Sequence, residues 1–592
     1  MAAATPWHRF RAPLLILLVA AVAATPIARH GPFCGDDSEF HLISWLDAQQ
    51  SWLHGIPYPH WSPSPNYGAG EPRFLFYPPL TWMLGAALGL VLPWAWVPVA
   101  MVFLLLAGTG LATRALARRL LAVAPATLAA IASICSGYVL YTAYERAAFA
   151  ELAGGFWVPL LLLFALRDDA PSAASWRRAF DGSTVPLALV VAGAWLSNAP
   201  VGVMASYLLA GVAMGAAWLS RSWFPVIRAA TAGALGIALA AIYILPAAFE
   251  QRWVDIAEAT GISGEPGLKI ENNWLFGLGT DPAMKAHALE MRVVFELVSL
   301  MLAVALLSAL AVWIRRRVPP ATRTTWILLT CIPLVVLFLQ LPVSLPLWNL
   351  LPKLRFLQFP WRWTLVVEAP IAILLAAAIW PDASAKRFQR VLIPAVCSIF
   401  LLGIFAVAAR TFFRVCEPDG QLPALLAAYR SGTGFWGAYE YAPPGADNSL
   451  VATGLPDACF TPDPVRRLGI IQTPDHNPIW TAAQGSCDLT ATAHLRTPEH
   501  LHLVMTTSRP GFLIVRLHRF PAWRITVNGR VMSDLLQRID GLVVVPVQQG
   551  PIDLAADWTT TPDVYAARGV TGIAILLLAA LWYVERKNAV GE

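Results

Sequence analysis

Long apolar segments alternate with shorter polar segments along most of the chain. A helix that crosses the hydrocarbon core of a bilayer needs about 20 mostly apolar residues. Stretches that meet or approach this length predict membrane helices at about 12–29, 97–113, 120–140, 152–166, 184–199, 201–219, 226–247, 293–313, 325–341, 364–380, 390–409 and 567–584. The stretch 78–93 is also apolar but short, which gives about 12–13 membrane segments in all.

The composition agrees with a membrane protein. Hydrophobic residues make up 57% of the 592 residues and charged residues only 13%, whereas soluble domains carry about 25% charged residues. The chain is too apolar for an intrinsically disordered protein. In a membrane protein, the net charge of +6 is better explained by basic cytoplasmic loops than by nucleic-acid binding.

The positions of Lys and Arg predict the orientation. Basic residues precede the first span, follow 293–313 as Arg315–Arg317, and follow the last span as ERK. These clusters share one side of the membrane if 78–93 is re-entrant or interfacial and makes no net crossing. We therefore expect cytoplasmic N- and C-termini. A cleaved signal peptide is the alternative for the first span, but we expect it to be retained because further spans follow.

The same topology predicts the domains. The multi-span domain covers 1–409 and includes a long first outer loop, 30–77. Residues 410–566 have the composition of a soluble domain and form the largest outer segment, and 567–592 hold the last helix and a cytoplasmic tail. Alternating runs such as GFLIVRLH, and the Asn528-Gly529 pair, predict antiparallel β structure over 490–557. A disulfide between Cys459 and Cys487 is plausible there, although spacing alone does not fix the pairing.

The first outer loop carries adjacent acids soon after the first span. A carboxylate of Asp36 or Asp37 can act as a general base toward an acceptor hydroxyl, and its neighbour can raise its pKa. If 38–50 is helical, His41 shares a face with Asp37 and joins the candidate site. The alternative is that the two aspartates cap that helix.

Two other outer segments carry charges at the membrane surface. Glu145, Arg146 and Glu151 lie in YERAAFAE, where they form either an interfacial ion pair or a phosphate site with Glu151 as a second acid. Arg355 and Arg362 alternate with aromatic residues in KLRFLQFPWRW. An arginine can fork onto a phosphate while aromatic rings cover a lipid chain, although a snorkelling interfacial helix would look the same.

Motifs for other chemistries are missing from the sequence. We find no P-loop, HExxH, CxxC or GxSxG motif in its proper context, which argues against an ATP-driven pump and a zinc protease. The histidine spacing in the first loop matches no closed zinc pattern. We therefore predict no resident metal site and no certain cofactor, and we leave a divalent cation open.

Several motifs together resemble a bacterial membrane family labelled "6-pyruvoyl-tetrahydropterin synthase-related". They are D-x-x-x-H, G-I-P-Y-P-x-W ending at Trp61, N-Y-G-A-G-E-P, and F-Y-P-P-L with Tyr77, followed by YERAAFAE, FLQFPWRW, YEYAPP and FPAWRITVNGR. The resemblance covers nearly the whole chain. The pterin-synthase activity in the label does not fit, because the chain has no matching zinc-ligand set. The family looks like a branch of the GT-C glycosyltransferase superfamily.

This resemblance implies a GT-C-like fold with a C-terminal extracytoplasmic β-rich domain, in the bacterial inner membrane. It implies transfer of a sugar from a polyprenyl-phosphate donor to an envelope acceptor, with the key acid in the first outer loop. Asp37 fits that place, with Asp36 beside it and Glu151 as a further candidate acid. The candidate substrate-binding residues are His41, Glu145, Arg146, Arg355, Arg362, Trp61 and Tyr77.

Two other functions stay open. A transporter or flippase for a lipid-linked saccharide would need ionisable residues deep within its spans, and the predicted spans hold few. A non-catalytic protein for envelope assembly would use the β-rich domain to bind a partner, but about twelve spans exceed what an anchor needs.

Overall fold

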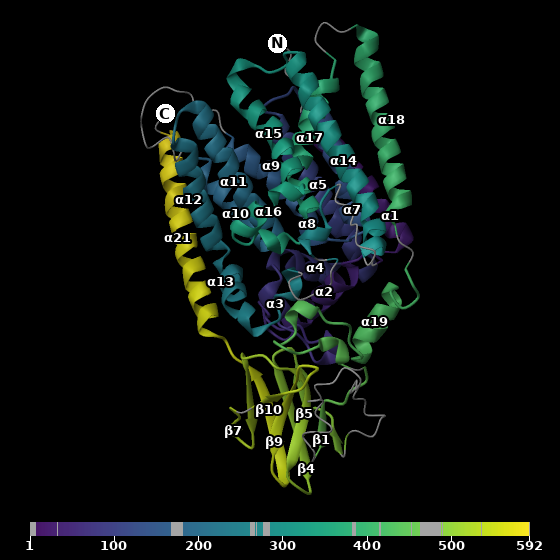
Figure 1. Ribbon diagram of the computed structural model, residues 1–592, viewed down its shortest axis with the longest axis vertical. Helices are drawn as coiled ribbons and strands as arrows, with labels where there is room; N and C mark the ends of the chain where they lie inside the picture. The colour runs from purple at the N-terminus through teal and green to yellow at the C-terminus, as the bar shows by residue number, and fades with distance from the viewer. Residues whose placement is uncertain are drawn as a thin grey trace.

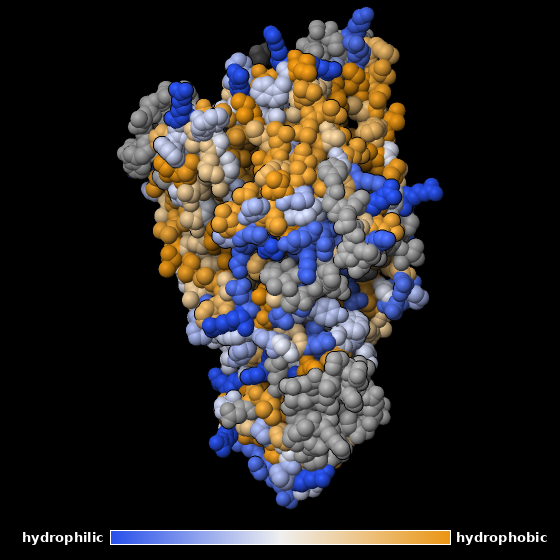
Figure 2. Space-filling view, in the orientation of Figure 1, coloured by the Kyte–Doolittle hydropathy of each residue, from blue (hydrophilic) through white to orange (hydrophobic). Residues whose placement is uncertain are grey.

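The structure is a computed structural model of the chain. It describes residues 7–31, 34–166, 182–260, 267, 269–275, 284–381, 386–413, 416–451, 453–461, 487, 489–533 and 535–590. Helices form one long body, and a β-sandwich projects from one end of it (Figure 1). Figure 2 shows apolar side chains over most of the helical body, whereas hydrophilic ones gather toward the sandwich and at the opposite tip. This face thus has an apolar band between two polar ends.

Within the described residues, eight helices are long and apolar enough to cross a membrane. They are Phe10–Arg29, Trp94–Ala117, Val123–Tyr144, Ala199–Ser220, His287–Ile314, Pro320–Leu339, Pro360–Ile379 and Pro562–Lys587. A bent pair, Phe224–Leu239 with Ala241–Trp253, adds up to one more, and four shorter apolar helices accompany them. The prediction of a polytopic α-helical membrane protein with a β-rich domain is confirmed.

The helices follow the predicted apolar segments closely. Those of the first half are α1 (Trp7–His30), α2 (Ser38–Leu53), α3 (Arg73–Phe76), α4 (Pro79–Val91), α5 (Val97–Ala117), α6 (Val123–Ile134), α7 (Gly137–Tyr144), α8 (Phe149–Leu152), α9 (Gly154–Ala165), α10 (Thr184–Ser197), α11 (Ala199–Ser220), α12 (Phe224–Leu239) and α13 (Ala241–Glu250). Those of the second half are α14 (Lys285–Ile314), α15 (Arg323–Leu339), α16 (Leu345–Leu350), α17 (Thr364–Ile379), α18 (Arg387–Thr411), α19 (Leu422–Ser431) and α21 (Pro562–Val590). Helix α17 is buried along most of its length, whereas α21 lies at the edge of the body (Figure 1).

Helix α4 corresponds to the short apolar stretch 78–93. Its 13 residues span about 20 Å at 1.5 Å per residue, less than the roughly 30 Å of a hydrocarbon core. It packs against α2 of the first loop. Its length suits the predicted segment that does not cross the membrane by itself.

The predicted single span 226–247 is divided in the structure. Helices α12 and α13 meet at Ala240 with a bend of 71°. A broken helix leaves backbone groups that need new partners. Here the backbone N–H of Ile242 donates to the hydroxyl of Thr571 in α21, 3.0 Å away. The last helix therefore completes the break and supports α13.

The β-sandwich consists of two five-stranded antiparallel sheets. The strands are β1 (Ala458–Thr461), β2 (Leu489–Ala491), β3 (Leu495–Thr497), β4 (His500–Thr507), β5 (Gly511–His518), β6 (Trp523–Val527), β7 (Arg530–Val531), β8 (Leu536–Gln537), β9 (Leu542–Val547) and β10 (Gly550–Trp558). One sheet has the order β2-β1-β5-β9-β8, the other β3-β4-β10-β6-β7. Asn528 and Gly529 join β6 to β7 with φ of 50° and 77°, as the predicted hairpin turn requires.

Two disulfides tie distant segments together. Cys459 bonds to Cys487, which is the pair that the sequence makes plausible. Cys34 in the first loop bonds to Cys416 after α18, across 382 residues of chain. The second disulfide holds the segment that leads into the sandwich beside the first loop.

Candidate active site between the helical body and the sandwich

A cavity of about 630 Å³ lies where the first loop, the loop after α7, α11, α13 and the segment before α17 meet. Its polar lining includes Asp36, Asp37, Tyr77, Arg146, Glu151, Asn198, Tyr243, Gln251, Lys353, Gln358, Arg362, Glu440 and Tyr441. One side of it is apolar and is formed mainly by α11, α13 and residues 356–359. The cavity therefore offers a charged end and an apolar wall in one space.

Backbone contacts place Asp37 beside Arg146. The N–H of Asp37 donates to the carbonyl of Arg146 at 2.8 Å, and that of Asp36 donates to the carbonyl of Glu145 at 3.1 Å. Gly35 permits this approach, because a Cβ there would lie 2.6 Å from the Cβ of Ala147. These two hydrogen bonds thus fix the first loop and the loop after α7 relative to each other.

Asp37 occupies the N-cap position of α2, but its side chain makes no capping hydrogen bond. The expectation that it caps the helix therefore fails for the side chain. Burial raises the pKa of Asp37, while the guanidinium groups of Arg146 and Arg362 act in the opposite direction. A carboxyl group whose pKa is raised is a stronger base once it is ionised. Asp36 is exposed by comparison.

Glu151 holds two arginines at the inner end of the cavity. Its Oε2 lies 2.7 Å from Nη1 of Arg146 and 3.4 Å from Nε of Arg362, and its Oε1 accepts a hydrogen bond of 2.6 Å from Tyr138. Arg362 also donates to the side chain of Gln358 at 3.1 Å. Two guanidinium charges against one carboxylate leave this cluster with one net positive charge. Such a cluster can bind an anion.

Strained backbone flanks the cavity. Ala147, Lys353 and Gln358 have φ of 49°, 61° and 63°, in a region that non-glycine residues rarely adopt. Such strain costs on the order of 1–3 kcal/mol per residue and tends to collect at functional sites. The three residues lie next to or within the segments that present Arg146 and Arg362.

Four of the predicted site residues lie outside the cavity lining. Trp61 packs on Trp523 and Trp558 of the sandwich, because its loop is covered by that domain. Arg355 is held by Glu271 at 3.0 Å. Glu145 contributes its backbone carbonyl to the contact with Asp36. These three residues are not part of the cavity lining, and the roles of all predicted site residues stay predictions.

His41 is the fourth. Its ring is fully buried among Trp45, Phe149 and Tyr77, and neither ring nitrogen has a hydrogen-bond partner among the described residues. Burial, with the nearby charge of Arg73, lowers the pKa of His41 to about 3. It is therefore a neutral ring that supports Tyr77, one layer behind the cavity.

Glu440 and Tyr441 were missed by the sequence reasoning. They come from a short helical turn, Tyr439–Tyr441, after α19, and both line the cavity. Burial raises the pKa of Glu440. The one available signal was the motif YEYAPP, which gives no indication that its carboxylate faces residues near the start of the chain.

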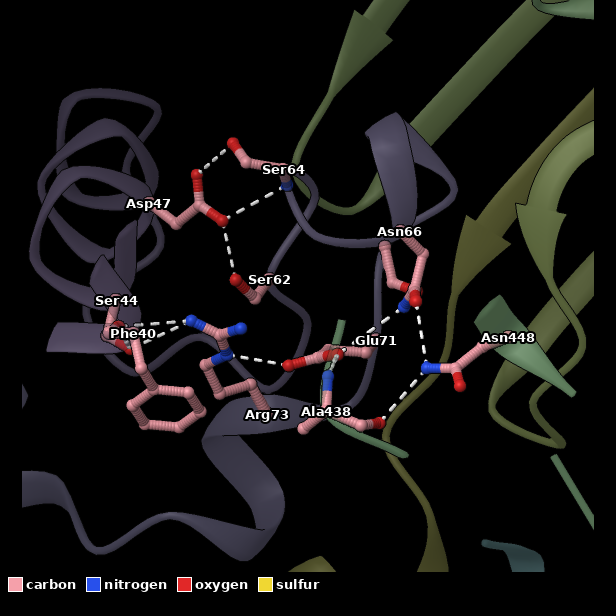
Figure 3. Close-up of polar contacts among 11 residues, drawn as sticks. Phe40, Ser44, Asp47, Ser62, Ser64, Asn66, Glu71, Arg73, Ala438 and Asn448 are labelled. Carbon is pink, nitrogen blue, oxygen red and sulfur yellow. Dashed lines mark hydrogen bonds and ion pairs between the residues drawn. The ribbon is translucent and has the colours of Figure 1, made fainter. Parts of the chain in front are cut away.

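A buried polar clamp fixes the first loop (Figure 3). Arg73 and Glu71 form an ion pair of 2.6 Å with side chains 1% and 0% exposed, and Arg73 also donates to the carbonyl of Phe40 at 3.1 Å. Glu71 accepts a hydrogen bond from the backbone of Ala438 at 2.9 Å. The clamp therefore joins α2, the end of the first loop and the segment that carries Glu440.

A metal ion has no evident site in the part of the chain that the structure describes, where no group of three or more His, Cys, Asp or Glu side chains has suitable geometry. The charged end of the cavity mixes carboxylates with guanidinium groups instead.

Comparisons with known proteins give low-identity matches to solved structures. The Archaeoglobus fulgidus oligosaccharyltransferase in its apo form matches with a TM-score of 0.43 and 13% identity, over 74% of this chain and 62% of that one. AglB from the same organism, in complex with an inhibitory peptide and a dolichol-phosphate, matches with a TM-score of 0.43 and 11% identity, over 72% and 58%. ArnT from Cupriavidus metallidurans, bound to undecaprenyl phosphate, matches with a TM-score of 0.35 and 14% identity, over 73% and 75%.

The chain thus spans 62% and 58% of the length of the first two structures. No family model matches the sequence, and no curated protein matches it. The resemblance to the pterin-synthase-related family therefore stays a prediction.

Proposed function

We propose that this membrane protein is a glycosyltransferase that moves a sugar from a polyprenyl-phosphate donor to an acceptor hydroxyl on the extracytoplasmic face. The observation that carries the proposal is one cavity in which Asp37 faces the net-positive cluster of Arg146, Glu151 and Arg362. A base for the acceptor and a cationic site for a phosphate are the two groups that this reaction needs.

The charged end of the cavity suits the chemistry. Arg146 and Arg362 bind the donor phosphate and stabilise the charge that collects on it. Asp37 takes the proton of the acceptor hydroxyl as the acceptor oxygen bonds to the anomeric carbon. The bond from that carbon to the phosphate oxygen breaks, and its electrons leave with the phosphate. The cluster is already paired and oriented by Glu151, so little reorganisation is needed during the reaction.

The apolar wall suits the lipid part of such a donor. The cavity is lined by Ala199, Pro200 and Val203 at the start of α11 and by Ile244 and Ala247 of α13. A prenyl chain gains free energy from such contacts in proportion to the apolar area removed from water. With the prenyl chain on this wall, the donor would enter from the lipid side, and its phosphate would reach Arg362 and Arg146.

A transfer assay in membranes tests the proposal. Radiolabelled polyprenyl-phosphate sugars are supplied as a panel to membranes that contain the protein, and the label is followed into non-lipid products. Transfer that depends on the protein supports the proposal. Transfer that proceeds equally after Asp37→Asn and Arg362→Gln, at equal protein levels, would refute the assignment of this cavity.

Arg362→Gln is expected to lower kcat/KM for the donor by about 10–100-fold, because a charged hydrogen bond to phosphate contributes about 1.5–3 kcal/mol. Inhibition by undecaprenyl phosphate should weaken with it. Arg355→Gln is the matched control, since Arg355 has its partner Glu271 outside the cavity. Equal losses in the two variants would show that overall surface charge, and not this cluster, attracts the donor.

The disulfides support the proposed orientation. Disulfides form and persist on the oxidising side of a membrane, and Cys34–Cys416 and Cys459–Cys487 both lie at the sandwich end. In a Cys34→Ser variant, Cys416 is expected to react with a membrane-impermeant maleimide added to intact cells. In the wild type it should react only after reduction. Labelling that requires permeabilised cells would reverse the orientation.

A transporter would place ionisable groups along its spans. Glu368 is such a buried group, in α17, and it lies in the first turns of that helix, just after Arg362. Arg228 and Glu585 are also buried, near the start of α12 and the end of α21. These buried charges lie toward the ends of their helices and not along the spans, and this favours the enzyme over a flippase.

A further inference from the structure

A small patch of aromatic side chains lies outside the cavity. Trp436 and Tyr439 have 57% and 53% of their surfaces exposed. The ring of Tyr67 meets that of Trp436 edge-on, with centroids 5.4 Å apart. These three residues, here called the aromatic platform, come from the first loop and from the segment before Glu440. Large aromatic rings exposed together mark binding surfaces more often than chance.

The fold holds Tyr67 in an unusual way. Asn66 and Tyr67 are consecutive non-glycine residues with φ of 52° and 50°. The side chain of Asn66 is fixed by Asn448 at 2.9 Å and by the carbonyl of Gly70 at 3.1 Å (Figure 3). Buried hydrogen bonds of Asn66 thus maintain a strained turn, and this turn leaves the ring of Tyr67 partly exposed.

Anchorage in the lipid interface, a common role for Trp and Tyr, does not suit this platform. The turn that carries Tyr67 is bound to the sandwich: the carbonyl of Gly68 accepts a hydrogen bond from Arg496, and the carbonyl of Ala69 accepts one from the N–H of His518 at 3.0 Å. The ring of Tyr67 therefore belongs to the sandwich side of the molecule.

Carboxylates adjoin the platform on the side of the cavity. Burial raises the pKa of the Tyr67 phenol, and the nearby Glu39 and Tyr439 raise this pKa further. Glu39 lies two residues after Asp37 in the first turn of α2. The platform thus adjoins the site at Glu440, which follows Tyr439 in the same helical turn and lines the cavity.

We propose that the aromatic platform of Tyr67, Trp436 and Tyr439 is a binding site for a saccharide chain, whose end reaches the cavity past Glu39 and Glu440. One face of a sugar ring presents C–H groups that pack on an aromatic face. Its hydroxyl groups donate to carboxylates, which are strong acceptors. A neutral oligosaccharide matches a surface that offers both.

The inference deepens the proposed function by naming the acceptor as a saccharide, and it rests on that function only for the acceptor role. Binding can be measured without any donor. The full-length protein in nanodiscs is titrated by calorimetry with a panel of neutral oligosaccharides, namely glucans, mannans, galactans, xylans and arabinans. Trp436→Ala and Tyr439→Ala are compared with Trp218→Ala, a control on the apolar surface of α11 that is 81% exposed.

At least one saccharide class is expected to bind. Trp436→Ala and Tyr439→Ala should each weaken that binding by about 10–100-fold, as for a central aromatic contact, and Trp218→Ala should leave it unchanged. A panel without any binding would overturn the inference, and so would binding that survives both platform substitutions.

A lipid anchor gives a different signal. If brominated phospholipids in the nanodisc quench a fluorescence component that Trp436→Phe removes, the platform contacts lipid and the inference is wrong. Saccharide binding without any sugar transfer would retain the platform and refute the proposed function. Sugar transfer without saccharide binding would retain the proposed function and refute the platform as a binding site.

Discussion

Asp37→Asn is expected to reduce sugar transfer by about 10²–10⁴-fold, the range for loss of a general base, with unchanged protein level and thermal stability. The amide has nearly the shape of the carboxylate but cannot accept the acceptor's proton. Donor binding should change little, because Arg146 and Arg362 keep their contacts with Glu151. The measurement is kcat and the donor KM in purified protein.

The pH dependence gives a second readout of the same group. A general base must be ionised, and burial raises the pKa of Asp37. Transfer should therefore fall as the pH falls through this raised pKa, at a pH above the ordinary value of about 3.9, and this acid limb should vanish from the residual activity of Asp37→Asn. Asp36→Asn should lose less, since Asp36 is more exposed. Asp553→Asn on the sandwich is the neutral control, and an equal loss there would contradict a role for Asp37.

Arg73→Met is expected to destabilise the fold by about 3–5 kcal/mol, because it leaves the carboxylate of Glu71 buried without its cation. Both side chains are almost wholly inaccessible, and the clamp joins the first loop to the segment of Ala438. The measurement is chemical denaturation of the purified protein in mixed micelles.

The double variant Glu71→Gln with Arg73→Met should recover much of that loss, since no unpaired charge remains. Arg292→Met provides the matched control: Arg292 also pairs with a glutamate at 2.7 Å, but both side chains are more than half exposed, and such pairs contribute little. If Arg73→Met were no worse than Arg292→Met, the clamp would not be a stabilising element.

Hydropathy located the helices well because lipid solvation is a local requirement on each segment. The predicted span 201–219 is α11, Ala199–Ser220, and the predicted 364–380 is α17, Thr364–Ile379. The signal for the hairpin at Asn528-Gly529 was equally local, since a type I′ turn needs two central residues that tolerate positive φ.

The break at Ala240 was not predictable in the same way. The sequence there is a run of small apolar residues that reads as one continuous span. What permits the break is Thr571, which lies 329 residues further along the chain from Ile242. A local hydropathy pattern cannot predict a hydrogen-bond partner that is so distant in the sequence.

The candidate site shows the same division. Asp37, Arg146 and Arg362 stood out as charged residues beside predicted spans, and the structure brings them to one cavity. The ion pair of Arg362 with Glu151, and the approach of Glu440 to the same cavity, depend on packing between segments hundreds of residues apart. Conversely, Arg355 has the same sequence context as Arg362 but turns to Glu271, which periodicity does not distinguish.

The contact between α13 and α21 also fixes an order of events during synthesis. One wall of the cavity is α13, and Thr571 of α21 accepts a hydrogen bond from the backbone at its broken start. Thr571 follows the sandwich in the chain, so a ribosome must translate the whole sandwich before that wall can settle. Until then the break between α12 and α13 lacks this hydrogen bond, so the cavity wall is complete only after residue 571 has been made.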